Sequence, residues 1–188
     1  FCKNSDQERA ASNRRLLDDF VPDKAPLEFV QSVFRHLLDE RVPIRNLPVL
    51  LETIAEGRTM FNTAEEVAEF VRQRISRHFV SALQNEDGAV PLIQIGLDWE
   101  STFADHETQG ASGATDVALP PEDFNKLAQA VVEQINQATA RNLYPAIVTS
   151  SKRRRFIRAV MKAKKIRNPV LSYEEIDSGL KPLLIGTA

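Results

Sequence analysis

The chain has 188 residues, of which 43% are hydrophobic, and a formal net charge of −2. This content is sufficient for a buried core in one domain or two small ones. So small a net charge does not by itself indicate a nucleic-acid or membrane partner. Cys2 is the single cysteine, which excludes an intramolecular disulfide and fits a reducing compartment. No apolar run approaches the roughly 20 residues that a bilayer crossing needs.

Helical periodicity dominates the first part of the chain. We expect residues 1–26 to be an N-terminal tether with a short helix at 8–20, followed by a helical subdomain over 27–85. Its first helix is predicted to open at Pro26. The expected core stripe of that helix is Leu27, Val30, Phe34, Leu37 and Leu38.

Capping residues mark the next two helices. Asn46 is a natural N-cap for a short helix, which we expect to end with Gly57 just past it as the C′ residue. Thr63 and Glu66 have the spacing of a capping box, in which each side chain accepts a hydrogen bond from the backbone of the other residue. The helix that they open is predicted to run to about Phe79.

The periodicity changes after the Asn-Glu-Asp-Gly turn at residues 85–88. Strands are predicted at 90–97, 146–149, 170–173 and 183–185, and helices after Pro120 and after Ser150. Residues 101–117 are polar and without period, which predicts a surface loop. The resulting order β-α-β-α-β-β predicts a small α/β subdomain over 86–188, with some parallel pairing through right-handed crossovers. The fold class is therefore expected to be α+β.

No pattern of catalytic residues is present. The histidines His36, His78 and His106 are too far apart to suggest a zinc site with a single cysteine. Phosphate-binding loops and nucleophile elbows are also missing from the sequence. The acid pairs Asp98/Glu100 and Glu174/Glu175 are interpreted as exposed strand ends. We therefore expect no enzyme activity, no cofactor and no metal.

Residues 152–167 contain nine Lys or Arg and no acid. We expect an amphipathic helix with Phe156 and Val160 buried and residues 153–155 exposed, so that Arg154→Glu would hardly change the melting temperature. The candidate basic face consists of Lys152, Arg153, Arg154, Arg155 and Arg158. It could be a solvated surface, bind an acidic protein surface, or bind nucleic acid or anionic lipid. Cations at a helix N-terminus oppose the helix dipole, which suggests either a function or a neighbouring acid.

Four segments occur in an order that resembles a known family. They are Leu-Leu-Asp-Asp-Phe-Val-Pro at residues 16–22, Val-Pro-Ile-Arg-Asn at 42–46, Pro-Ala-Ile-Val-Thr at 145–149 and Val-Leu-Ser-Tyr-Glu-Glu-Ile at 170–176. Together they resemble the FlhA/InvA/LcrD family of export-gate proteins in flagellar and virulence type III secretion systems. The Gly-Thr-Ala ending favours the flagellar branch.

The resemblance implies a fold and a function. It implies that the chain is the last part of a cytoplasmic region that follows an inner-membrane region, and that this region forms a homo-oligomeric ring. The ring is expected to dock export substrates, chaperones and components of the ATPase complex. The helical subdomain would contribute most of the subunit contact, and we expect Arg45, Glu52 and Glu56 to lie in it. The alternative is a soluble helical adaptor that binds nucleic acid through the basic helix at 152–167.

Overall fold

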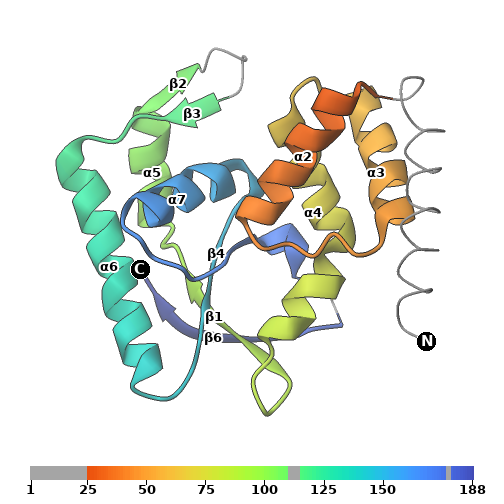
Figure 1. Cartoon of the computed structure of the whole chain (residues 1–188). Coiled ribbons are helices and arrows are strands. Elements are labelled where there is room, and N and C mark those ends of the chain that lie inside the picture. The colour runs from red at the N-terminus through yellow and green to blue at the C-terminus, as the bar shows by residue number, and fades with distance from the viewer. Residues whose placement is uncertain (1–24, 110–114, 177–178) are drawn as a thin grey trace. The chain divides into compact units, whose positions relative to one another are not determined.

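The computed structural model describes residues 25–109, 115–176 and 179–188 (Figure 1). The predicted helix at 8–20 lies outside these residues. The chain divides into two compact units, residues 1–75 and 76–188, within which the described residues form six α-helices and two sheets. The division falls inside a helix because Phe79 and Val80 pack into the core of the second unit. The predicted subdomain boundary at residue 85 stays a prediction.

The first unit is built from α2 (Leu27–Asp39), α3 (Leu47–Met60) and most of α4 (Ala64–Val80). The core stripe predicted for α2 is partly wrong, because Leu27 and Leu38 are 43% and 52% exposed. Val33 is fully buried instead, since α2 is rotated to bring positions 30, 33 and 37 inward. The buried apolar side chains of this unit include Val30, Val33, Leu37, Leu50, Leu51, Ile54, Val67, Ala68 and Val71.

The predicted capping box at the start of α4 is confirmed. The Glu66 N–H donates to Thr63 Oγ1 at 3.3 Å, and the Thr63 N–H donates to Glu66 Oε2 at 3.2 Å. Asn46 is the N-cap residue of α3, although its side chain makes no capping hydrogen bond. Helix α3 therefore begins at the predicted residue, but without the capping hydrogen bond expected from the Asn46 side chain.

The prediction that Gly57 ends α3 is wrong, because the helix continues to Met60. Gly57 instead lies where α3 packs against α4. A Cβ atom at this position would lie 3.0 Å from Phe70 Cδ1 and 3.2 Å from Val67 Cγ1. Both distances are tighter than ordinary van der Waals contact, so the missing side chain lets α3 and α4 approach closely.

We expect Gly57→Val to destabilise the first unit by about 1–3 kcal/mol, because the added methyl groups overpack the contact between α3 and α4. Thermal unfolding followed by circular dichroism measures this. Glu52→Val is the matched control, since it places the same β-branched side chain at an exposed position of α3. Equal melting temperatures for the two variants would contradict the packing role.

The second unit contains a four-stranded parallel sheet. Its strands are β1 (Ala89–Gln94), β4 (Ala146–Thr149), β5 (Val170–Ser172) and β6 (Lys181–Thr187), in the order β5-β4-β1-β6. Between them lie α6 (Pro121–Thr139) and α7 (Ser151–Ala163). The predicted order of these strands and helices is confirmed. Since β1, β4 and β5 follow one another across the sheet, right-handed crossovers place α6 and α7 on the same face.

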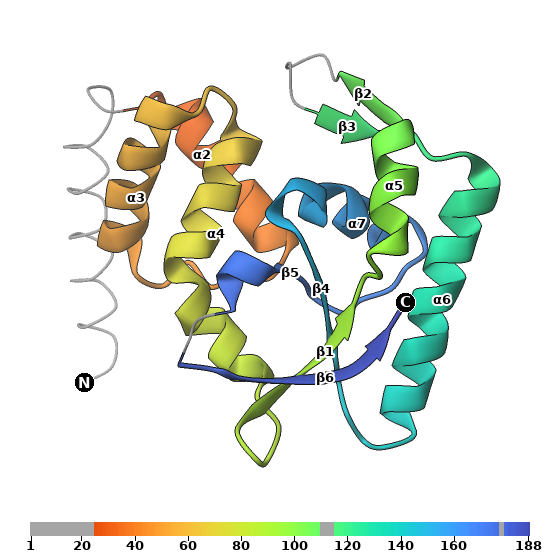
Figure 2. The same ribbon diagram turned by 180° about the vertical axis from the view of Figure 1, so that it is seen from behind.

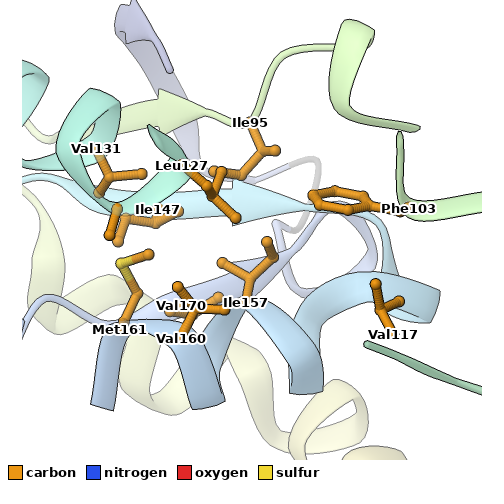
Figure 3. Close-up of a cluster of buried hydrophobic side chains, with 11 residues drawn as sticks. Ile95, Phe103, Val117, Leu127, Val131, Ile147, Ile157, Val160, Met161 and Val170 are labelled. Atoms are coloured by element: carbon orange, nitrogen blue, oxygen red, sulfur yellow. The ribbon is translucent and has the colours of Figure 1, made fainter. Parts of the chain in front are cut away.

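The main core lies between that face of the sheet and its helices (Figure 3). α6 contributes Leu127 and Val131, and α7 contributes Ile157, Val160 and Met161. The opposite face of the sheet is covered by a second cluster that includes Val80, Leu83, Ile176 and Leu180. β6 pairs with β1 on the side away from β4 and so lies at the edge of the sheet (Figure 2).

The prediction of a surface loop at 101–117 is wrong over its described residues. They form most of α5 (Asp98–Asp105) and the antiparallel hairpin of β2 (Glu107–Gln109) and β3 (Thr115–Val117). Trp99 and Phe103 stack with ring centroids 5.9 Å apart, and Phe103 is fully buried. A few aromatic and apolar side chains therefore anchor a segment whose composition is otherwise polar.

Candidate interaction surfaces

The candidate subunit interface on α3 is exposed as predicted. Arg45, Glu52 and Glu56 are all exposed, Arg45 in the connection before the helix and the two acids on it. Within the described residues, Arg45 and Glu52 make no ion pair. Glu56 instead accepts a hydrogen bond from Arg74 Nη2 at 2.5 Å, and Arg74 lies 5.1 Å from the centroid of the Phe70 ring. Of the three residues, Glu56 already has a partner on α4.

The candidate basic face on α7 is not a continuous exposed surface. Arg153 and Arg154 are only 2% and 1% exposed, so the prediction that residues 153–155 are exposed is wrong for two of three. Lys152 and Arg155 are exposed and Arg158 is half-buried. The basic face is therefore divided into buried and solvated parts.

Arg154 lies on the buried side of α7 and has a structural role. Its Nη1 donates to the backbone carbonyl of Val170 on β5 at 3.2 Å. Nearby in the sequence, Glu175 is also buried, at 1% exposed, and its Oε2 accepts the Ser172 N–H at 2.8 Å. The interpretation of Glu174/Glu175 as an exposed acid pair is therefore wrong for Glu175, which closes a capping box on the short helical turn after β5.

Arg153 and Lys152 join α7 to two acids from other elements. Arg153 Nε donates to Glu100 Oε2 at 3.1 Å, and Arg153 Nη2 lies 2.6 Å from Glu107 Oε1. Lys152 Nζ also lies 2.6 Å from Glu107 Oε1. The Arg153 guanidinium is 5.6 Å from the centroid of the Phe103 ring. Glu107 is thus the neighbouring acid that offsets Lys152 and Arg153 at this helix N-terminus. Glu100 lies in the first turn of α5, so its interpretation as a strand end is wrong.

This geometry shifts the titration of Glu107. Hydrogen bonds from Lys152 and then Arg153 hold the pKa of the Glu107 carboxyl below its ordinary value of 4.5, because both stabilise the charged form. The carboxylate is therefore ionised at neutral pH.

Helical spacing contained a signal for the buried arginines. Positions 157, 160 and 161 are buried, and stepping back three or four residues from Ile157 reaches Arg154 and Arg153. The buried side of α7 therefore includes two arginines. The sequence analysis missed them because a run of charged residues usually indicates a solvated surface.

The histidines do not form a shared site. His36 Nε2 lies 3.9 Å from Glu65 Oε1, His78 is exposed, and His106 Nδ1 is 2.8 Å from the Thr102 carbonyl oxygen. Across residues 25–109, 115–176 and 179–188, no group of three or more His, Cys, Asp and Glu could hold a metal ion. Among the helices of the same residues, none is both long and apolar enough to cross a membrane.

Arg154→Glu should destabilise the second unit by about 3–5 kcal/mol, because it replaces a buried, hydrogen-bonded cation by a buried anion. This reverses the expectation from the sequence. Arg155→Glu is the adjacent control at an exposed position of α7, and should change stability by no more than about 0.5 kcal/mol. Urea unfolding of both variants measures the effect; similar midpoints would show that Arg154 tolerates reversal.

The ion pairs of Glu107 should make stability depend on pH. Since its folded-state pKa is lowered, its contribution is fully present above pH 4.5 and is lost as pH falls through the lowered pKa. The melting temperature of Glu107→Gln should therefore lie below wild type at neutral pH and converge with it in acid. Glu133→Gln, at an exposed acid of α6, is the control. A gap that stays constant in acid would contradict this assignment.

Comparison with known proteins supplies the family. The model of the FHIPEP family matches residues 5–181. The flagellar biosynthesis protein FlhA of Caulobacter vibrioides is 31% identical over 170 residues, which cover 90% of this chain and 24% of that protein. The chain therefore spans about a quarter of the length of this relative.

Solved structures share the fold. The C-terminal domain of InvA superposes with a TM-score of 0.79 at 22% identity, covering 94% of this chain and 56% of that one. A structure described as nonameric EPEC SctV-C gives a TM-score of 0.72, also at 22% identity and over the same shares of the two chains. The predicted α+β fold class is confirmed by this likeness. Because the family model covers nearly the whole sequence, the chain belongs to the FHIPEP family.

Proposed function

We propose that this chain is a non-catalytic assembly and docking module of a type III protein export gate. The observation that carries the proposal is the FHIPEP match over residues 5–181, supported by a fold like that of the InvA C-terminal domain. Both units contribute to this likeness, since it covers 94% of the chain. The proposed role is to present surfaces to other proteins from a stable scaffold.

Self-association is the first part of the proposed role. A nonameric assembly is described for the related SctV-C, and we propose that the intact protein likewise forms a ring. Arg45 and Glu52 are suited to the subunit contact because they are exposed and make no ion pair within the described residues. Val49, 39% exposed in the first turn of α3, adds apolar area between them in the sequence. Glu56 would contribute less, since Arg74 already binds it.

Docking and location form the second part. In the intact protein, we propose that an upstream region attaches the module to the inner membrane and that this chain faces the cytoplasm. Export substrates, chaperones and proteins of the ATPase complex are the proposed partners. No cofactor is required for a role of this kind.

A nucleic-acid adaptor is less well supported by the geometry. Phosphate binding needs accessible cations, and neutralising several phosphates makes affinity strongly dependent on salt. Arg153 and Arg154 are buried, while Lys152 and Arg153 are already paired with Glu107. The basic helix therefore offers fewer cations to phosphates than its sequence suggests.

The ring proposal predicts that charge reversal of both Arg45 and Glu52 weakens assembly of the full-length protein. Each exposed charge contributes only about 0–1 kcal/mol, so the double variant is needed. Cross-linking of membranes measures ring abundance, and a secretion assay reports function. The control reverses Glu28 and Arg35, which are exposed on α2 of the same unit. Rings as abundant as wild type, with normal secretion, would place the contact elsewhere.

A further inference from the structure

The four-stranded sheet has one edge whose outer backbone groups are bonded by side chains. This is the β5 edge, where all three strand residues are buried. The Pro169 carbonyl accepts a hydrogen bond from β4, so alternation along the strand turns the backbone groups of Val170 and Ser172 away from β4. Arg154 Nη1 donates to the Val170 carbonyl, and the Ser172 N–H donates to Glu175 Oε2. The outer edge of β5 is therefore closed to a further strand.

The opposite edge is β6, and the direction of its backbone groups follows from its bonds to β1. The Ala188 N–H donates to the Gln94 carbonyl at 2.9 Å, and the Gly96 N–H donates to the Ala188 carbonyl at 2.8 Å. Ala188 therefore faces β1. Because backbone groups alternate along a strand, the N–H and C=O of Thr187 point away from β1.

The register gives the same outward direction for Leu184. Since Gln94 bonds to β6, alternation along β1 makes Leu92 face β6 as well. Leu183 lies opposite Pro91, next to Leu92, and is the residue that these groups of β1 reach. Leu184 therefore turns its N–H and C=O outward. Within the residues that the structure describes, neither Leu184 nor Thr187 has a hydrogen-bond partner on this outer side.

The side chains at the β6 edge are mostly apolar. Leu183 and Leu184 are 38% and 57% exposed. Leu184 lies opposite Leu92, a member of the second cluster, so a further strand beside β6 would extend that apolar face. Lys181 and Pro182 are residues of the kind that protect edge strands from pairing, but they stand only at the start of β6. The rest of the edge is an open template for a strand.

A second copy of this chain does not fit this edge. Head-to-tail pairing of β6 with β5 of a neighbour is prevented, because Arg154 and Glu175 already occupy the outer groups of β5. Two β6 edges can pair only about a twofold axis, which joins subunits in twos. A ring like the nonameric one described for SctV-C has an odd number of subunits, so such pairs cannot include all of them. The occupant is therefore a different protein.

We propose that the outer edge of β6 binds an extended, apolar segment of a partner protein as a fifth strand of the sheet. The segment pairs with the outward N–H and C=O groups of Leu184 and Thr187, on either side of the bulge at Ile185, and packs an apolar side chain on Leu184. This inference rests on the proposed docking role and deepens it, because it names the chemistry of a partner. The ring variants lie in the first unit, so ring assembly can fail while strand binding holds, and the reverse.

The test measures binding of a fluorescent peptide to the purified chain by anisotropy. The probe is a heptapeptide of alternating valine and threonine, as long as β6, with one added lysine for solubility. Its control has the same side chains but N-methylated internal amides, which cannot donate hydrogen bonds. N-methylation should weaken binding by about tenfold or more, because several main-chain bonds are lost together.

Two variants at one position separate the main chain from the side chain. Leu184→Pro removes an outward N–H that β1 does not use, and should also weaken binding by about tenfold or more. Leu184→Val keeps this N–H and an apolar side chain, and should bind like wild type. Circular dichroism checks that both variants are folded. Equal binding of the N-methylated peptide, or of the parent peptide to folded Leu184→Pro, would overturn the proposal.

Hydrogen exchange of the unmodified chain provides a readout that needs no variant. The peptide should slow exchange of the Leu184 and Thr187 amides and leave the Leu183 and Ala188 amides, which already bond to β1, unchanged. Unaltered exchange at Leu184 and Thr187 in saturating peptide would overturn the proposal. Protection of these two amides that rises with chain concentration without peptide, together with dimers in sedimentation, would overturn it by assigning the edge to a second copy.

Discussion

Two buried arginines in the first turn of α7 constrain the second unit. A guanidinium cannot be deprotonated in a protein, so Arg153 and Arg154 must find acceptors wherever they are buried. Arg154 binds the Val170 carbonyl on β5, and Arg153 binds Glu100 on α5 and Glu107 on β2. These contacts fix the start of α7 to the sheet, to α5 and to β2. They also decide which cations of the basic segment reach the surface.

The parallel sheet explains why these contacts converge. The crossovers from β1 to β4 and from β4 to β5 move in the same direction across the sheet, and α6 and α7 pack in one core on the same face. Ile176 and Leu180 pack on the other face. Side chains therefore pack on both faces of the sheet, while the edge strand β6 stays largely exposed.

Charge has different physical roles in the two units. In the first unit, Arg45, just before α3, and Glu52, on α3, are exposed, and a charge at an exposed position adds little affinity and acts mainly on specificity. At the start of α7, Oε1 of the Glu107 carboxylate lies 2.6 Å from each of two cations, and Arg153 is almost fully desolvated. Removing Glu107 would leave the buried charge of Arg153 with one carboxylate fewer, whereas changing Arg45 or Glu52 alters only an exposed surface. The exposed charges are therefore suited to specificity, and the Glu107 contacts are suited to holding β2 against α7.

The sequence by itself determined the order of the sheet strands with α6 and α7, the α+β class, the capping box at Thr63 and the family resemblance. These features are local or depend on the order of short motifs, so neighbouring residues are sufficient to encode them. Only the tertiary structure decided that Gly57 lies within a helix contact, that Phe103 anchors a polar segment and that Arg153 is buried. Arg153 meets Glu100 across 53 residues of sequence, and Lys152 meets Glu107 across 45. Whether a charge is solvated or buried depends on partners that folding brings together, and helical periodicity alone cannot identify them.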